Sequence, residues 1–219
     1  MSIKQNLLKI QSQIPQHVTL VAVSKTKPNT DIIEAYEAGQ RVFGENKIQE
    51  MVDKHEALPK DIQWHMIGHV QRNKVKYMAP FVSLIHGVDS FKLLKEIDKE
   101  AKKNSRTINC LLQIKIAKEE SKFGMSEKDA VQLLQSEAFN NLKNVQITGV
   151  MGMATFTDNT SQIENEFLTL KNIFDTLHKQ YPNFKTISMG MSGDYQTAIA
   201  SGSTMIRVGS SIFGSRNYN

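Results

Sequence analysis

The strongest constraint on the fold is an alternation of short apolar runs with longer amphipathic segments. Runs rich in aliphatic and β-branched residues recur at residues 18–23, 41–43, 62–67, 81–85, 108–116, 145–150, 186–189 and 204–208. Between them, apolar residues recur at helical spacing, most clearly in segments 30–38, 90–103, 126–139 and 160–181. Short strands that alternate with amphipathic helices form a parallel sheet covered by helices. This number of strand–helix units favours a closed (β/α)₈ barrel over an open sheet.

Two further patterns complete the predicted architecture. Ser126 and Asp129 have the spacing of a capping box at the start of the segment 126–139. Residues 2–14 are polar and amphipathic, which predicts an extra helix before the first strand. We therefore expect an α/β fold, a single (β/α)₈ TIM barrel domain over residues 1–219 with an additional N-terminal helix.

The composition excludes several broad classes of protein. The 219 residues are 40% hydrophobic and 22% charged, which is typical of a globular domain with one sizeable core. No run approaches the roughly 18 apolar residues of a membrane span, and the start of the chain has no signal-peptide pattern. Cys110 is the single cysteine, so no internal disulfide can form. We expect a cytoplasmic protein without membrane contact and, since no outer helix is strongly apolar, a monomer.

Positive charge is concentrated in one segment. The formal net charge is +5, and residues 92–106 contain 6 lysines and arginines. Glu96, Asp98 and Glu100 alternate with them at spacings that allow ion pairs on a helix. This pattern favours a solvated outer helix, and nucleic-acid binding is not expected because no aromatic platform accompanies the charge. An RNA-binding or partner-binding surface is the alternative.

Functional side chains are expected where the strands end, because the loops that follow them form the active face of such barrels. Lys25 follows the first apolar run and shares strand parity with Val21 and Val23, so it is expected to enter the barrel mouth. Low polarity there favours a neutral amine, which can condense with an aldehyde. Lys27 has the same parity, but Pro28 marks a turn that should carry it outward. A solvated rim lysine is the alternative for Lys25.

Two small-residue loops follow the last two apolar runs. Residues 190–194 read Gly-Met-Ser-Gly-Asp, and residues 209–211 read Gly-Ser-Ser. Each precedes a predicted helical turn, where free backbone N–H groups favour an anion. Many (β/α)₈ barrels hold a phosphate at these two positions. Together the loops predict a phosphate site, whereas each alone would be read as an ordinary turn.

Other residues complete the predicted mouth. Arg207 precedes the second loop and is expected to reach a ligand ring, and His65 is expected to stack on that ring or hydrogen-bond to it. His65 and His69 have a spacing seen in metal sites, but Gly68 interrupts them and no carboxylate cluster accompanies them, so we expect no metal. Met189 is expected to pack adaptably around the rim.

Five stretches, taken together and in order, resemble the pyridoxal phosphate homeostasis proteins, the YggS/PROSC family. They are VSKTKP at 23–28, FGEN at 43–46, WHMIG at 64–68, SMGMS at 188–192 and RVGSSIFG at 207–214. The resemblance implies a barrel similar to the alanine racemase N-terminal domain that holds pyridoxal 5′-phosphate as a Schiff base on Lys25. It also implies a phosphate held by Ser192, Gly209 and Ser210, with Arg207 near the pyridine nitrogen. The predicted cofactor-binding residues are Lys25, Asn46, His65, Met189, Ser192, Arg207, Gly209 and Ser210.

The chain departs from this family pattern at two positions. Gly193 stands where an acidic residue is expected, and His69 stands where a small residue or proline is expected. Neither departure falls on the lysine or the arginine.

The resemblance, combined with the chemistry of Arg207, predicts a carrier of the cofactor. An arginine is charged and can only donate, so it disfavours protonation of the pyridine nitrogen and weakens the cofactor as an electron sink. Related racemases use a second base from an added domain, and this chain ends at Asn219. We expect no catalytic residue, a role in vitamin B6 homeostasis without efficient turnover, and delivery of the cofactor to PLP-dependent apo-enzymes. The alternatives are a low-activity PLP-dependent amino-acid racemase and a phosphosugar enzyme.

Overall fold

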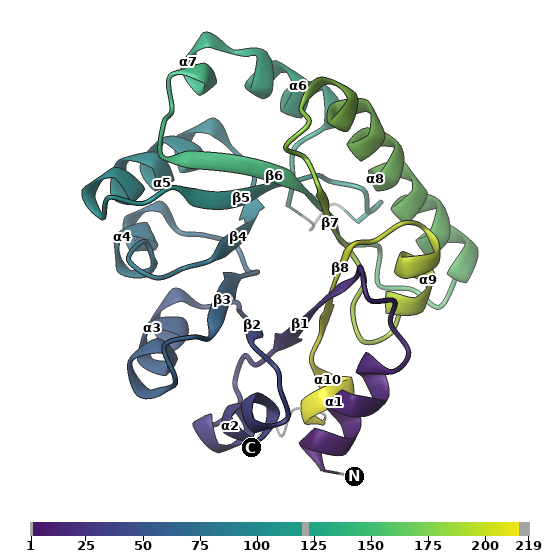
Figure 1. Cartoon of the computed structure of the whole chain (residues 1–219). Helices are drawn as coiled ribbons and strands as arrows, with labels where there is room; N and C mark the ends of the chain where they lie inside the picture. Colours follow the sequence, from purple (N-terminus) through teal and green to yellow (C-terminus); the bar gives the residue numbers. More distant parts are fainter. Residues whose placement is uncertain (1, 120–122, 215–219) are drawn as a thin grey trace.

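A closed parallel barrel forms the centre of the molecule (Figure 1). The computed structural model describes residues 2–119 and 123–214. Its strands are β1 (Thr19–Val23), β2 (Val42–Glu45), β3 (Gln63–Met66), β4 (Leu84–Val88), β5 (Ile108–Gln113), β6 (Val145–Met151), β7 (Thr186–Ser188) and β8 (Met205–Val208). Neighbouring strands pair in chain order, and β8 pairs with β1 to close the barrel. The predicted (β/α)₈ fold class is confirmed, and each predicted apolar run overlaps a strand.

One strand lies later in the chain than its apolar run predicts. The run 81–85 begins with residues that complete the turn after a short helix, since the amides of Phe81 and Val82 both donate to the carbonyl of Met78. Those amides are therefore not available to a strand ladder. The strand β4 begins only at Leu84 and extends to Val88.

Helices surround the barrel on its outer side (Figure 1). They are α1 (Ile3–Gln11), α2 (Asn29–Glu37), α3 (Ile48–Ala57), η1 (Arg72–Lys74), α4 (Val75–Met78), α5 (Phe91–Lys103), α6 (Glu127–Gln135), α7 (Glu137–Asn140), α8 (Thr160–Gln180), α9 (Tyr195–Ala200) and α10 (Ser210–Phe213). The predicted segment 126–139 is two helices, because Ser136 has an extended backbone with ψ 139° and caps α7 with its side chain. The predicted capping box of Ser126 and Asp129 is present.

The predicted N-terminal helix is confirmed as α1, and it packs beside the last helix of the barrel. Ser2 and Gln5 form a capping box at its start. Asn6 Nδ2 donates to the carbonyl oxygen of Ile212 at 3.0 Å, which links α1 to α10. Residues far apart in the chain therefore meet beside the closure of the barrel between β1 and β8 (Figure 1).

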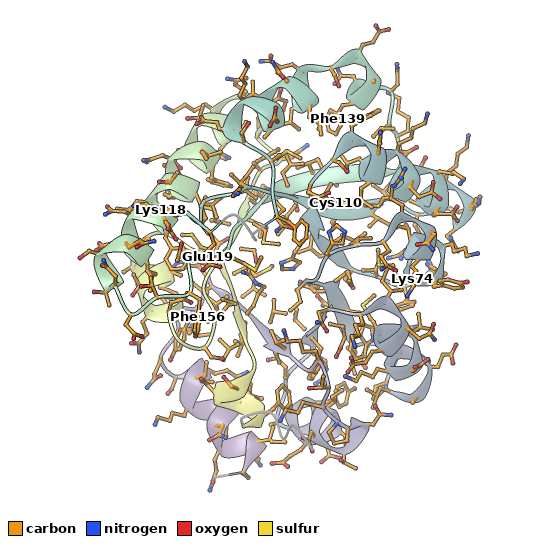
Figure 2. The ribbon with its side chains drawn as sticks, turned by 180° about the vertical axis from the view of Figure 1, so that it is seen from behind. Lys74, Cys110, Lys118, Glu119, Phe139 and Phe156 are labelled. Carbon is orange, nitrogen blue, oxygen red and sulfur yellow. The ribbon has the colours of Figure 1, made fainter. Side chains whose placement is uncertain are left out.

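The core has an inner and an outer part. Inside the barrel, one cluster of buried side chains contains Val21, Leu84, Leu111, Met151 and Met205. The larger outer cluster lies between the strands and the helices, and it includes fully buried Cys110 (Figure 2). Alternation of side chains along a strand explains the division. On β1, Val21 belongs to the inner cluster, whereas Leu20 and Ala22 belong to the outer one.

The basic segment forms the exposed outer helix α5. Lys99 Nζ lies 3.0 Å from Glu96, and Lys103 Nζ lies 2.7 Å from Glu100, both at i,i+3 spacing. These pairs agree with the predicted ion pairing on this helix. Within residues 2–119 and 123–214, we find no helix that combines the length and the apolar character needed to cross a membrane.

Candidate functional site at the carboxyl ends of the strands

Lys25 lies in a tight turn directly after β1. The amide of Lys27 donates to the carbonyl oxygen of Ser24 at 3.0 Å, so Lys25 and Thr26 are the two central residues of a β-turn. Thr26 has φ 65°, a left-handed conformation that type II turns normally reserve for glycine. Lys25 is half-buried. Lys27 has different surroundings, since its Nζ donates to the carbonyl of Phe213 at 2.8 Å.

The two predicted phosphate loops are brought together beside the end of β1. The amide of Gly209 donates to Ser192 Oγ at 3.2 Å, which joins the loops after β7 and β8. A Cβ atom at Gly209 would lie 3.1 Å from the carbonyl oxygen of Val23 and 3.2 Å from its Cβ. Only a glycine lets the backbone approach this closely without displacing β1. The turn of Lys25, Ser192 and Gly209 therefore belong to one region of the barrel mouth, and Ser210 begins α10 beside it.

Arg207 is buried in the barrel wall with only 4% of its surface exposed. Its Nη1 donates to the carbonyl oxygen of Ser188 at 2.8 Å and to Ser188 Oγ at 2.6 Å. Its Nη2 donates to the carbonyl of Gly152 at 3.1 Å. Burial lowers the pKa of Arg207 to about 10, so the guanidinium stays charged at neutral pH. Asp194 acts in the opposite direction and raises this pKa.

A chain of hydrogen bonds leads from Arg207 across the barrel interior. Ser188 Oγ lies 3.0 Å from His86 Nδ1, and His86 Nε2 lies 3.1 Å from His65 Nδ1. Burial lowers the pKa of His65 to about 3 and that of His86 well below its ordinary value, with the charge of Arg207 lowering the latter further. Both imidazoles are therefore neutral at physiological pH.

The structure places His65 deeper than the sequence predicts. It is buried inside the barrel and lines a cavity of about 510 Å³ together with Thr19, Gln63 and Thr186, which begin their strands. Hydrogen bonds through His86 and Ser188 link it to Arg207. His69, its partner in the excluded metal spacing, instead stacks on Phe123 and lies 3.6 Å from Asp89. The described part of the chain contains no group of three or more His, Cys, Asp or Glu side chains that could hold a metal ion.

Asn46 and Met189 have contrasting environments. Asn46 follows β2, and its Oδ1 atom is buried without a hydrogen-bond partner in the part of the chain that the structure describes. An unpaired buried acceptor of this kind is unusual in a folded protein. Met189 follows β7, but its side chain is fully buried in the outer core cluster. Met189 therefore packs in the outer core, apart from the turn of Lys25 and the loops of Ser192 and Gly209.

The loops after β5 and β6 are tied to each other at the rim. The amide of Lys118 donates to Thr155 Oγ1 at 3.2 Å, and the amide of Phe156 donates to Glu119 Oε1 at 2.6 Å (Figure 2). Glu166 of α8 accepts from both the amide and the hydroxyl of Thr155. The side chain of Phe156 is 93% exposed. These contacts give the rim a defined shape on the side of β5 and β6.

The predicted site residues did not include His86, Ser188, Glu45 and Lys54, although Ser188 and Glu45 lie within the quoted stretches. A signal for His86 was present, because it directly follows the apolar run 81–85 at the position where functional residues of a barrel are expected. Ser188 shares an inward position with Arg207, which only the pairing of β7 with β8 reveals. Glu45 and Lys54 meet across the contact of β2 with α3, for which the sequence offers no local pattern.

Comparisons with known proteins agree with this geometry. A family model described as alanine racemase, N-terminal domain, matches residues 1–217. The chain is 39% identical to the pyridoxal phosphate homeostasis protein of Vibrio alginolyticus, over 100% of this chain and 99% of that protein. It is 36% identical to the protein of the same name from Escherichia coli K12, over 94% of this chain and 88% of that protein.

Solved structures show the same relationship. PipY of Synechococcus elongatus, determined with PLP bound, has a TM-score of 0.88 and 36% identity, covering 97% of this chain and 100% of that one. Alanine racemase of Clostridium difficile has a TM-score of 0.77 at 13% identity and shares the fold, covering 100% of this chain and 57% of its own. The chain therefore belongs to the alanine racemase N-terminal domain family and, within it, to the pyridoxal phosphate homeostasis proteins.

Proposed function

We propose that this protein binds pyridoxal 5′-phosphate as a Schiff base on Lys25 and takes part in PLP homeostasis without efficient turnover of its own. The observation that carries the proposal is the convergence of the Lys25 turn with the joined loops of Ser192 and Gly209. An aldehyde and a phosphate belong to the same small cofactor, so an amine beside a phosphate cradle suits both of its ends. Relatives named for pyridoxal phosphate homeostasis support it.

The residues present fit this cofactor. The close approach of Gly209 to Val23 brings the backbone of the cradle next to the end of β1, and a Cβ atom at Gly209 would press on it. The orphaned Oδ1 of Asn46 is an acceptor that a ligand donor can satisfy. Arg207 has five N–H donors, of which three account for its bonds to Ser188 and Gly152. It can therefore also donate to a ring nitrogen. Lys25, Asn46, Ser192, Arg207, Gly209 and Ser210 would hold the cofactor.

The charge on Arg207 argues for a carrier. Bound pyridoxal phosphate supplies an electron sink, and that sink is strongest when the ring nitrogen is protonated. A guanidinium with a pKa of about 10 keeps its protons at neutral pH and cannot accept one from the ring. Arg207 thus holds the ring without strengthening the sink. Lys25 would then act as a reversible anchor, from which the aldehyde passes to the amine of a PLP-dependent apo-enzyme. Residence in the cytoplasm as a monomer is part of this proposal.

A labelling experiment tests the Schiff base. The purified protein is mixed with pyridoxal phosphate, its absorbance is followed over pH, and the adduct is reduced with borohydride and mapped by mass spectrometry. We expect the reduced adduct on Lys25, its loss in Lys25→Ala and its retention in Lys27→Ala. Lys27 is the matched control because it is close in sequence but bonded to Phe213. An adduct that survives Lys25→Ala would contradict the assignment.

A second assay tests the absence of efficient turnover. The protein loaded with pyridoxal phosphate is incubated with individual amino acids, and racemisation, transamination and decarboxylation are measured. We expect rates far below the ordinary enzymatic range of about 1–10³ s⁻¹. Racemisation within that range would instead establish an amino-acid racemase.

A further inference from the structure

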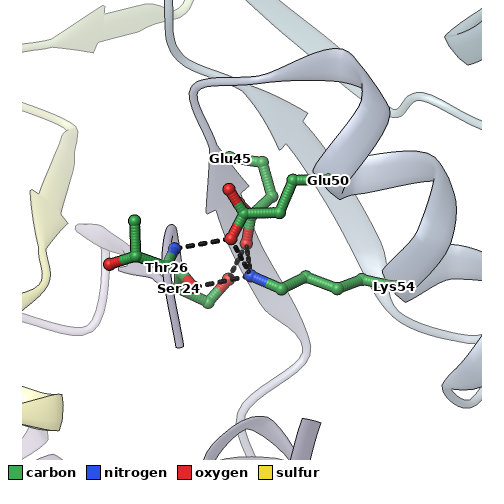
Figure 3. A network of polar contacts seen from close by, with 5 residues as sticks. All are labelled: Ser24, Thr26, Glu45, Glu50 and Lys54. Atoms are coloured by element: carbon green, nitrogen blue, oxygen red, sulfur yellow. Dashed lines mark hydrogen bonds and ion pairs between the residues drawn. The ribbon is translucent and has the colours of Figure 1, made fainter. Parts of the chain in front are cut away.

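A buried polar network lies behind the turn that carries Lys25. Lys54 of α3 donates to the carbonyl of Ser24 at 2.7 Å, to Glu45 Oε1 at 2.8 Å and to Glu50 Oε1 at 2.7 Å (Figure 3). Its side chain is only 7% exposed, and that of Glu45 is fully buried. An ammonium group has three N–H donors, so each one has a protein acceptor here.

The same network reaches the other side of the turn. Glu50 Oε1, which accepts from Lys54, also accepts from the backbone amide of Thr26 at 2.5 Å (Figure 3). Ser24 Oγ donates to Glu45 Oε1 at 2.5 Å. Lys54 is thus linked to the residue before Lys25 directly and to the residue after it through Glu50.

The turn requires such support because of its backbone conformation. Thr26 is β-branched and adopts φ 65°, which disfavours the turn unless surrounding contacts compensate. The amide of this residue donates to Glu50 in the observed conformation of the turn. The amide of Ser24 donates to the carbonyl of Gly44 at 3.1 Å, and Lys25 follows in the turn. The groups of the network come from Ser24, Thr26, β2 and α3, so the network contacts the backbone on both sides of Lys25.

We propose that Lys54 is a positioning residue which, with Glu50, holds the strained Lys25 turn in the geometry that condensation with an aldehyde requires. This inference rests on the proposed function of Lys25 as the Schiff-base residue. Burial raises the pKa of Glu45, and the adjacent charge of Lys54 opposes that rise, so the network also depends on Lys54 remaining charged. Methionine at position 54 would keep the length of the side chain and remove all three donors.

The test compares Lys54→Met, Glu50→Ala and the double variant Thr26→Gly/Lys54→Met. One readout is the rate at which borohydride fixes pyridoxal phosphate on Lys25, and the other is hydrogen exchange of the Thr26 amide without cofactor. We expect Lys54→Met to slow labelling by about tenfold or more, as expected when a reacting group loses its orientation, and to expose the Thr26 amide. Glycine at position 26 accepts a positive φ without strain. The double variant should therefore regain most of the labelling rate, although the buried carboxylates still lack their partner.

Asp98→Asn is the matched control. Asp98 of α5 also holds two backbone amides, those of Lys143 and Asn144 at 2.9 and 2.6 Å, but these residues precede β6 at the opposite end of the strands. It should lower stability without slowing labelling of Lys25. If Lys54→Met does not fold, Glu50→Ala carries the test, because it removes the acceptor of the Thr26 amide and keeps the bonds of Lys54 to Ser24 and Glu45; it should slow labelling and expose the Thr26 amide in the same way.

The possible outcomes separate this inference from the proposed function. If the unaltered protein gives no adduct on Lys25, the proposed function fails, and exchange of the Thr26 amide still reports whether Lys54 holds the turn. If the adduct forms but folded Lys54→Met labels at the normal rate, the positioning role is overturned. Failure of Thr26→Gly to restore labelling would also overturn it, because the loss would then follow general stability.

Discussion

Ser188 of β7 and His86 of β4 are joined across the barrel interior by a 3.0 Å hydrogen bond between Ser188 Oγ and His86 Nδ1. Arg207 contacts the same hydroxyl. A guanidinium can only donate, so Ser188 Oγ accepts from Arg207. The oxygen keeps a second lone pair, so the tautomer of His86 decides whether the imidazole donates to Ser188 or accepts from it.

The first prediction concerns the histidine tautomers. We expect the Ser188 hydroxyl to donate to His86 Nδ1, because its oxygen already accepts from Arg207; the proton of His86 is then on Nε2, from which it donates to His65 Nδ1. His65 then carries its proton on Nε2. Long-range ¹⁵N–¹H correlation spectra of the histidine rings distinguish the two tautomers directly. A proton on Nδ1 of His86 at neutral pH would show that the chain runs in the opposite direction.

The second prediction concerns the removal of the hydroxyl that joins the chain. Ser188→Ala leaves His86 Nδ1 buried without its partner, so the free energy of unfolding should fall by about 1–3 kcal/mol in urea titrations. Ser12→Ala is the control, because Ser12 is exposed and makes a single bond to the carbonyl of Lys9. Its effect should stay within about 0.5 kcal/mol. Equal effects of the two substitutions would mean that the buried chain contributes nothing to stability.

The third prediction concerns pH. The pKa of His65 is about 3 in the folded protein, against about 6.5 in the unfolded chain. Below pH 6.5 the unfolded chain therefore binds a proton that the folded protein does not, and the free energy of unfolding falls as pH decreases towards 3. The slope from this residue is at most about 1.4 kcal/mol per pH unit.

The variant His65→Asn isolates this contribution. Its Oδ1 can still accept from His86, but the side chain does not titrate. The difference in unfolding free energy between the two proteins should change in favour of the variant as pH falls from 6.5 to 5. A constant difference over this range would be inconsistent with a neutral buried His65.

The fourth prediction compares two glycines of the phosphate loops. A Cβ at Gly209 would press on Val23 at 3.1–3.2 Å, whereas a Cβ at Gly193 would meet nothing within 4 Å. Gly209→Ala should weaken pyridoxal phosphate binding by about tenfold, or about 1.4 kcal/mol, and Gly193→Ala should leave it unchanged. Equilibrium titration followed by absorbance measures both. A loss confined to Gly193→Ala would place the phosphate elsewhere in these loops.

The sequence alone was sufficient to predict the barrel, because fold class depends on periodicity along the chain. Alternating parity also predicted the inner position of Val21, and the capping box at Ser126 was readable from local spacing. The predicted boundaries of helices and strands were wrong where a local hydrogen bond competed with the pattern of apolar residues. Ser136 interrupted a predicted helix. The carbonyl of Met78 accepts from the amides of Phe81 and Val82, so β4 begins later than predicted.

The motifs and the predicted strand ends identified most residues of the candidate site from the sequence. They did not show how deeply each side chain is buried or which residues it contacts. Met189 and Ser188 are neighbours in one motif, yet one lies in the outer core and the other in the buried chain to Arg207. The position of Lys25 after the first strand followed from the sequence, whereas its place in a turn supported by Lys54 and Glu50 arises from contacts of α3 with β2 and with the residues after β1. The bonds from Thr26 to Glu50 and from Lys54 to Ser24 join residues 24 and 30 positions apart. Only the closed barrel brings these residues within hydrogen-bond distance.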